Sequence, residues 1–418
     1  MDRRDLLEYN KIKETLRRRN EVEAKKKRPV INRDIVKDND IVRVVGDMDR
    51  TFLVLVILLI CFGSVMVFSA SYAYAFSSKG DSYYFIKRQI VFVAVGLLGM
   101  LGIANWISPA FIKKVTNLYF GGVFIALIAV LVFGISEGEA QRWLIIPGTD
   151  FGIQPSEFMK LGLVLRLAKY FSDRENILDR NTFKLEPVVR RLGIPFMIVC
   201  VVCAMIALEK HFSGVIILFL VGTCVIFAAG GQWKWLAGAG AAFGSIVFAA
   251  IMLVPYARQR LDVFRHPEKY SSQSETWQTI QGVNAVGSGG FFGVGFGQSL
   301  QKHMFVSQPQ NDFIFAIVCE ELGFVGAVAM ISLFVALIWR GMVIAQNAPD
   351  IFSKLTVVGI MSKVAIQTIL NIAVVTNTIP NTGISLPFFS YGGSALIPLM
   401  AEMGIVLAIS RYSYQKKQ

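Results

Sequence analysis

The chain has 418 residues, of which 54% are hydrophobic and 17% are charged. Soluble domains carry about 25% charged residues, and several windows here exceed the run of about 18 apolar residues that is typical of a membrane helix. Composition therefore excludes a soluble protein and predicts an all-α polytopic membrane protein. The net charge of +13 does not indicate a nucleic-acid partner, because the basic residues cluster beside apolar segments as in the positive-inside rule.

Residues 1–50 are a polar extension with basic clusters at Arg17–Arg19 and Lys25–Arg28. Such clusters beside a membrane segment favour contact with anionic lipid head groups. We predict a basic cytoplasmic extension that is either partly helical or disordered.

The rest of the chain, residues 51–412, predicts a membrane domain of about ten transmembrane helices. An even number places both termini on one side, and the loop 172–191, the pair Lys113–Lys114 and the tail 413–418 share that side. Because these segments are basic, we predict that both termini are cytoplasmic. The predicted spans are 51–71, 89–106, 115–135, 156–171, 192–209, 213–230, 235–255, 312–338, 354–377 and 394–410.

The opposite, outer side carries loops 72–88, 136–155 and 379–393, and a large loop 256–311 between the seventh and eighth spans. A loop this long in a compact protein is more often functional than not. In the second outer loop, Arg142 could clamp a phosphate and Trp143 could pack on a sugar or an isoprenoid. Trp143 as a plain interfacial anchor is the alternative.

The fourth span predicts a helix start at Pro155, with Ser156 and Glu157 in its first turn, where proline and acidic residues are favoured. Lys160 follows one turn later and is a candidate for substrate binding. Five cysteines all fall in hydrophobic spans, and Cys200 and Cys203 lack a second pair or a histidine cluster. We therefore assign no residue to a metal.

The large outer loop contains Arg258, Arg265 and Lys302, and a glycine-dense stretch at 287–297. Guanidinium groups suit a pyrophosphate because they donate planar, bidentate hydrogen bonds. The alternative is that these are solvated loop charges. The glycines lack the strand and the Lys-Ser/Thr ending of a phosphate-binding loop, so tight turns at the membrane surface are the better interpretation.

The most informative segment is 308–326, because three carboxylates lie at or inside an apolar run. A charge in hydrocarbon costs a few kcal/mol or more and normally faces a polar cavity. On a helix, Asp312 and Glu320 share one face with Gly323 and are about 12 Å apart. We expect Asp312 at the membrane surface and Glu320 deep in the span, both facing a reactive cavity.

Polar side chains also recur in the last two spans. Lys363, Gln367 and Asn371 form one stripe, and Glu402 lies in the middle of the tenth span. Lys363 is a candidate for substrate contact, and a buried Lys363–Glu402 ion pair is the alternative. Loop 380–394, which contains Ser390, has the turn chemistry of a segment that lines a cavity.

Six motifs in this order closely resemble the bacterial SEDS family (shape, elongation, division and sporulation; RodA, FtsW and SpoVE types). The likeness covers residues 51–412, most closely to the FtsW and SpoVE branch. The motifs are Arg142-Trp143, 151–160 (FGIQPSEFMK), 298–302 (QSLQK), 311–316 (NDFIFA), 320–323 (EELG) and 386–394 (LPFFSYGGS).

The resemblance implies a ten-helix fold and a peptidoglycan glycosyltransferase that polymerises lipid II in cell division, cell shape or related wall synthesis. It implies a class B penicillin-binding protein and other divisome or elongation proteins as partners, beside lipid II and the growing glycan chain. The family's essential aspartate matches Asp312. Three positions depart from the family pattern: Gln308 stands where many members have Glu, Asn311 replaces Thr, and Glu402 occupies a position expected to be small or apolar.

In the implied reaction, Asp312 accepts the proton of the acceptor's 4-hydroxyl as that oxygen attacks the lipid-linked donor. Undecaprenyl diphosphate leaves, and Arg258, Arg265, Lys302 or a divalent cation (Mg²⁺ or Mn²⁺) would stabilise its charge. Two alternatives stay open. A lipid II flippase would use Glu320, Lys363 and Glu402 at mid-depth, and a non-enzymatic scaffold for a cell-wall transpeptidase would tolerate substitution of every polar residue.

Overall fold

The computed structural model describes residues 41–42, 46–137, 140–145, 152–174, 192–253, 255–266, 274–303, 305–413 and 415–416. Most of the predicted extension at 1–50, most of the basic loop 172–191 and part of the tail 413–418 lie outside these residues. The described part is mostly helical, as the composition predicted.

The first helices begin and end at clear local signals. Helix α2 (Arg50–Lys79) starts after Asp49, whose carboxylate accepts a hydrogen bond from the Phe52 amide, and it ends at Gly80 in the left-handed region (φ 72°). Helix α4 (Pro109–Phe133) starts with proline at its first position after the Ser108 cap. Both are preferred starting chemistries, because a capping oxygen satisfies a free backbone amide and proline lacks one.

A matching helix overlaps each predicted span. Six helices among the described residues, α2, α3, α4, α12, α13 and α14, are long and apolar enough to cross a membrane, and α7 and α8 are shorter apolar helices. The remaining bounds are α3 Tyr84–Trp106, α5 Pro155–Ser172, α7 Ile194–Leu208, α8 Phe212–Ala228, α9 Trp233–Leu253, α12 Ile314–Gln346, α13 Ile351–Val375 and α14 Gly393–Ser410.

Two segments predicted as loops contain regular structure. The large loop forms α10 (Pro255–Arg265) and α11 (Ser274–Ser288). Strands β2 (Ile135–Glu137), β3 (Ala140–Ile145) and β4 (Gly152–Ile153) pair as an antiparallel sheet in the order β2-β3-β4. Short strands carry little periodic signal in a membrane protein, so the all-α prediction holds for the bundle and misses this sheet.

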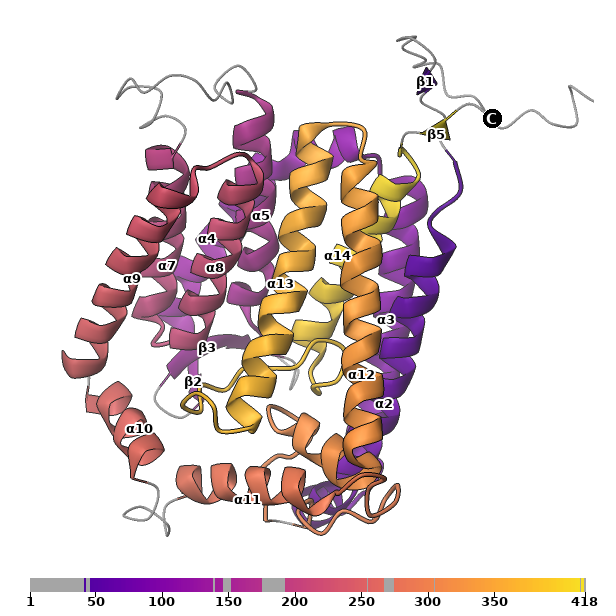
Figure 1. Ribbon diagram of the computed structural model, residues 1–418, viewed down its shortest axis with the longest axis vertical. Helices are drawn as coiled ribbons and strands as arrows, with labels where there is room; N and C mark the ends of the chain where they lie inside the picture. The colour runs from indigo at the N-terminus through magenta and orange to yellow at the C-terminus, as the bar shows by residue number, and fades with distance from the viewer. Residues whose placement is uncertain are drawn as a thin grey trace, which may run out of the picture.

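The helices form one bundle with two distinct ends (Figure 1). Strands β1 (Ile41–Val42) and β5 (Gln415–Lys416) pair beside one end, which we call the terminal end. Helices α10 and α11 lie at the other end, the loop end. Helix α14 packs against α3, and α13 packs against α5, α8 and α12, so the later helices fill the centre. Large apolar side chains such as Leu98 and Leu118 remain exposed on the flanking helices, as expected of a surface that faces lipid.

Helix α12 is broken at Gly323, whose backbone (φ 65°, ψ −163°) is non-helical. The break exposes backbone groups, and the glycine-rich loop satisfies them. The amides of Val294 and Gly295 donate to the carbonyls of Glu320 and Glu321 at 2.9 and 3.1 Å. The loop backbone therefore packs directly against the backbone of α12. Glycines are needed there because a side chain would keep the two backbones apart.

Candidate active site

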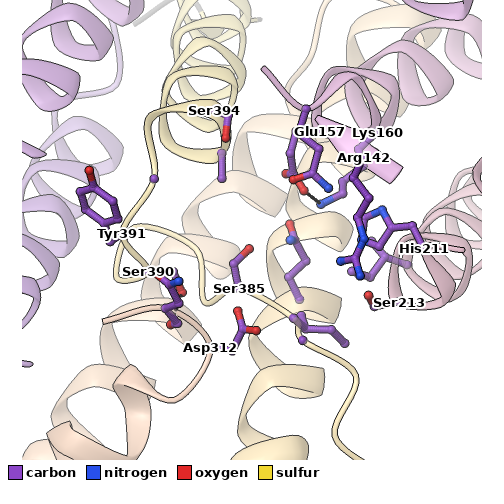
Figure 2. A pocket seen from close by; sticks show the side chains of 18 of the residues that line it. Arg142, Glu157, Lys160, His211, Ser213, Asp312, Ser385, Ser390, Tyr391 and Ser394 are labelled. Atoms are coloured by element: carbon purple, nitrogen blue, oxygen red, sulfur yellow. Dashed lines mark hydrogen bonds and ion pairs between the residues drawn. The ribbon is translucent and has the colours of Figure 1, made fainter. Parts of the chain in front are cut away.

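A polar cavity of about 280 Å³ lies between α5, the α7–α8 turn, α13 and the loop before α14. Figure 2 shows its labelled side chains converging from these elements. Its lining includes Arg142, Trp143, Gln154, Glu157, Lys160, His211, Ser213, Gln308, Asn311, Asp312, Gln367, Gly383, Ser385, Ser390, Tyr391 and Ser394.

Asp312 sits just before α12, and hydrogen bonds from two other segments fix its backbone. The Asn371 side-chain amide donates to the Asp312 carbonyl at 2.8 Å and to the Ile384 carbonyl at 2.6 Å. The Tyr391 amide donates to the Gln310 carbonyl at 2.9 Å. Helix α13 and the loop before α14 therefore hold Asp312 in place, which is the support a reacting group needs.

Gly383 provides the space for the Asp312 carboxylate. Its backbone is left-handed (φ 64°), and a Cβ atom there would lie 3.2 Å from Asp312 Oδ2. A side chain at this position would therefore be strained and would crowd the carboxylate. The glycine permits the loop to pass close to Asp312.

The opposite wall of the cavity carries two basic residues and one carboxylate. Lys160 donates to Glu157 Oε1 at 2.6 Å, and both are buried in the first turns of α5. Arg142 reaches the same wall from β3, as Figure 2 shows. The sheet and the start of α5 thus bring together two basic residues that are 18 positions apart.

His211 completes this wall from the turn between α7 and α8. Burial, together with the nearby charges of Arg142 and Lys160, lowers the pKa of His211 to about 3. Its Nδ1 lies 3.4 Å from Ser156 Oγ. His211 is therefore neutral at physiological pH and can offer a hydrogen bond but no charge.

The structure brings together five of the predicted site residues: Asp312, Arg142, Trp143, Lys160 and Ser390 all line the cavity. Ser390 Oγ donates to the Asn311 carbonyl at 2.9 Å and accepts from the Leu386 amide at 2.7 Å. Its hydroxyl thus holds the loop against the segment that carries Asp312.

Lys363 does not line the cavity, but it lies one turn of α13 away from Gln367, which does. Its ammonium donates to both Glu402 oxygens at 2.7 and 2.8 Å, and both side chains are buried. The ion-pair alternative is therefore confirmed. Lys363 borders a separate void of about 20 Å³, which also touches Glu157 and Gln367. A void of this size accommodates one water molecule.

Two predicted site residues are placed elsewhere. Lys302 is buried and donates to Glu321 Oε1 at 2.8 Å, and its ammonium also contacts Ser69 of α2. The Glu320 carboxylate accepts hydrogen bonds from the Ser299 hydroxyl and the Leu300 amide. Neither Lys302 nor Glu320 lines the cavity, and their charges instead tie the glycine-rich loop to α12 and α2.

The predicted depth of Glu320 is also wrong. Its neighbour Glu321 contacts Ser69, 19 residues into α2, which corresponds to about 28 Å from the terminal end. Asn371, which binds the Asp312 backbone, lies 20 residues into α13, or about 30 Å from the same end. Asp312 and Glu320 both belong to the loop end of the bundle.

Arg258 and Arg265 lie on α10, where both side chains are exposed. Helix α10 packs against α9 at the edge of the bundle (Figure 1), and neither arginine lines the cavity. They were predicted to bind pyrophosphate because of their charge and guanidinium chemistry. A basic residue in a long loop need not lie near the cavity. Solvated loop charge is the interpretation that fits this structure.

Sequence reasoning missed His211 and Glu157 as cavity residues. Glu157 had a usable signal, because an acidic residue three positions before Lys160 on a helix can pair with it. His211 belongs to the polar cluster Glu209–His211 at the end of the fifth span, but its place at the cavity depends on how the α7–α8 turn meets α5. Among the described residues, no group of three His, Cys, Asp or Glu side chains is arranged to hold a metal ion.

A model of the FtsW/RodA/SpoVE family, described as cell cycle protein, matches residues 49–415. The chain belongs to this family. Stage V sporulation protein E of Bacillus subtilis (strain 168) is 37% identical over 372 residues, 87% of this chain and 97% of that protein. Probable peptidoglycan glycosyltransferase FtsW of the same strain is 34% identical over 386 residues, 88% of this chain and 93% of that protein.

Solved structures of the FtsW/RodA/SpoVE fold agree with this one. Rod shape determining protein RodA of Thermus thermophilus matches with a TM-score of 0.64 at 25% identity, over 88% of this chain and 98% of that chain. A chain of the structure "Structural coordination of polymerization and crosslinking by a peptidoglycan synthase complex" matches with a TM-score of 0.71 at 24% identity, over 87% and 98% of the two chains. The protein is a multi-pass membrane protein of this family.

Proposed function

We propose that the protein is a peptidoglycan glycosyltransferase that polymerises lipid II, with Asp312 as its catalytic base. The observation that carries this proposal is the cavity in which Asp312 lies across from Arg142 and Lys160. The names of its relatives, among them probable peptidoglycan glycosyltransferase FtsW, support it. The reaction serves cell division or related wall synthesis.

The chemistry is a displacement at the anomeric carbon of a lipid-linked sugar. The 4-hydroxyl oxygen of the acceptor attacks that carbon, its proton passes to the Asp312 carboxylate, and the bond from the carbon to the diphosphate oxygen breaks. Undecaprenyl diphosphate leaves with the bonding electron pair. A positioned carboxylate contributes about 10²–10⁴-fold to such a step.

Arg142 and Lys160 replace the loop arginines as the proposed diphosphate contacts. Both side chains line the cavity that holds Asp312, where Lys160 is also paired with Glu157. Charge developing on a leaving diphosphate is stabilised most by fixed cations. Trp143 supplies an apolar face for sugar or isoprenoid. A divalent cation would be held by the Asp312 carboxylate together with diphosphate oxygens of the substrate, since Mg²⁺ often takes one or two protein carboxylates plus substrate phosphates, and it would neutralise charge on the leaving group.

We also propose ten transmembrane spans with both termini in the cytoplasm of a bacterial cell, so that the loop end faces outward. Lipid II presents its sugars outside the membrane, and strand β3, which carries the cavity residues Arg142 and Trp143, lies in the half of the bundle nearer the loop end. Class B penicillin-binding proteins and other divisome or elongation proteins are the proposed partners, and the basic residues 1–50 would contact anionic lipids.

The charges at depth favour an enzyme over a flippase. A flippase needs charged groups that a head group can reach, whereas Lys363 and Glu402 are buried and bind each other. A scaffold without activity does not need a glycine at 383 to accommodate a carboxylate. Both alternatives predict that a variant without the Asp312 charge keeps its function, which is transport for a flippase and transpeptidase recruitment for a scaffold.

The test is polymerisation of labelled lipid II by the purified protein with its cognate penicillin-binding protein made transpeptidase-dead. We expect Asp312→Asn to lower the rate at least about 100-fold, because the amide cannot accept the proton. Asp47→Asn, at an exposed position near the terminal end, is the matched control and should keep full activity. Full polymerisation by a folded Asp312→Asn protein would contradict the assignment.

A further inference from the structure

We propose that the outer end of α3 holds a second diphosphate-binding subsite, built on Arg88 and reached past Tyr391. Its ligand is the diphosphate of the second lipid-linked substrate. This inference rests on the proposed function, because only a polymerase must hold two such substrates at once. Arg142 and Lys160 would then bind one diphosphate and Arg88 the other.

The position of Tyr391 links Arg88 to the cavity. Tyr391 is a cavity-lining residue, and in Figure 2 it lies on the other side of Asp312 from Arg142, Lys160 and His211. Its side chain forms a hydrogen bond with Arg88. Basic residues therefore lie on both sides of Asp312: Arg88 beyond Tyr391 on one side, and Arg142 with Lys160 on the other.

Aromatic packing fixes Tyr391. Its ring lies edge-on to Phe85, with centroids 4.9 Å apart. Burial raises the pKa of the Tyr391 hydroxyl, so the hydroxyl stays protonated and neutral. The contact with Tyr391 therefore positions the Arg88 guanidinium without cancelling its charge.

Arg88 belongs to a group of basic residues at the same end of the bundle. Its guanidinium carbon lies 4.5 Å from the centroid of the Tyr84 ring, and Lys79 Nζ lies 5.6 Å from the same centroid. Stacking on an aromatic ring orients the planar guanidinium, and a planar fork suits bidentate contact with phosphate oxygens. Two cations over one ring give the charge density that a diphosphate requires.

Gln89 is a second polar residue of α3, on the helix face that Phe85 and Phe92 present to Tyr391. It follows Arg88 on α3 and is fully buried, yet neither its amide oxygen nor its amide nitrogen has a hydrogen-bond partner among the described residues. A buried amide without partners destabilises the fold, because it has given up its hydrogen bonds to water. A polar ligand between α3 and the loop before α14 would satisfy it.

The physical reason for two separate subsites is charge. Two lipid-linked diphosphates in a single cationic pocket would repel each other at short range, most strongly in a site shielded from water. Placing one on each side of Asp312 separates the charges and leaves the acceptor hydroxyl and the donor carbon to meet at the carboxylate.

The test uses two lipid II analogues that can each play only one role. A 4-deoxy analogue can act only as donor, and an analogue with a methylene group in place of the anomeric oxygen can act only as acceptor. Together they give one tetrasaccharide product, and KM is measured for each analogue separately. We expect Arg88→Gln to raise KM for one analogue about tenfold or more and Lys160→Gln to raise KM for the other.

Lys87→Gln is the matched control, because Lys87 is the exposed neighbour of Arg88 and pairs with Asp81 at 2.8 Å. It should leave both KM values unchanged. Arg88→Lys keeps the charge but loses the planar fork, so its KM should lie between wild type and Arg88→Gln, and it reports on the site if the glutamine variant does not fold.

Two results would overturn the second subsite while leaving the glycosyltransferase intact: Arg88→Gln and Lys160→Gln raising KM for the same analogue, or Arg88→Gln changing neither KM. Failure of the wild-type protein to form tetrasaccharide would instead overturn the proposed function, and this inference with it. The two failures are therefore distinguishable.

Discussion

At the scale of single residues, the α7–α8 turn places two titratable groups with opposite behaviour beside the cavity. Glu209 is buried, and neither carboxylate oxygen has a hydrogen-bond partner among the described residues. Burial raises the pKa of Glu209 to about 8, although Arg142 opposes the shift. His211, two positions later, is held neutral. Glu209 and His211 therefore add no charge beside the cavity near neutral pH, whereas Lys210 between them is exposed.

This environment predicts a stability that depends on pH. Between about pH 6.5 and 8 the folded protein keeps a proton on Glu209 that the unfolded chain has released, so stability falls as pH rises through this window. His211 contributes only below about pH 6.5, where the unfolded chain binds a proton that the folded protein does not, so its contribution makes stability rise with pH. We expect Glu209→Gln to flatten the dependence and to raise Tm at pH 8 by a few degrees.

The measurement is Tm in detergent at pH 6.5, 7.2 and 8 for wild type and Glu209→Gln. Asp47→Asn serves as a control that removes an exposed carboxylate. Equal slopes of Tm against pH in wild type and Glu209→Gln would show that Glu209 is already ionised in the folded protein.

At the scale of helices, buried ion pairs connect elements that packing alone would hold loosely. Lys363 and Glu402 join α13 to α14, and Lys302 and Glu321 join the glycine-rich loop to α12. In each pair the two charges compensate each other's loss of hydration. Removing one partner therefore costs more than removing both.

The pair between α13 and α14 gives a direct prediction. Glu402→Leu alone should destabilise the protein by about 3–5 kcal/mol, because it leaves the Lys363 ammonium buried without its partner. Lys363→Met should cost a similar amount. The double variant should recover most of the loss, since methionine and leucine fill the space without charge.

A double-mutant cycle on Tm and on denaturant midpoints measures this coupling. Additive losses in the double variant would mean that the two charges do not stabilise each other. Polymerisation by the double variant then distinguishes a structural role of the pair from a role in transport. Retained polymerisation indicates that the pair supports the fold, whereas a flippase would lose lipid II transport in the same variant.

At the scale of the whole molecule, the arrangement of the helices sets which end of the bundle faces outward. The turn after α2, at Gly80, and the turn between α12 and α13, at Asp350, belong to opposite ends. We expect alkaline phosphatase fused after Gly80 to be active, because it would fold outside the cell. The same enzyme fused after Asp350 should be inactive.

A green fluorescent protein fused after Asp350 is the reciprocal control and should fluoresce. The reversed pattern would contradict the proposed orientation and would place the cavity on the cytoplasmic side. The positive-inside rule gives the physical basis of the expectation, since basic segments stay on the cytoplasmic side.

Much of this protein could be predicted from its sequence. Long apolar runs determine membrane helices because the backbone has no other way to satisfy its hydrogen bonds in lipid. Pro155 marked the start of the fourth span, and α5 begins at that residue. Asp312 was a site candidate because a charged carboxylate in a hydrophobic segment is energetically costly. The motif resemblance pointed to the family that the comparisons confirmed.

Only the tertiary structure decided which charges face the cavity. Lys302, Glu320 and Lys363 looked like site residues in sequence, and each is buried against a partner from another element. Arg142 and His211 became neighbours because a short sheet and a helix turn meet at the start of α5. Sequence determines where a charge must be compensated, but the compensating group comes from distant segments, and only their packing selects it.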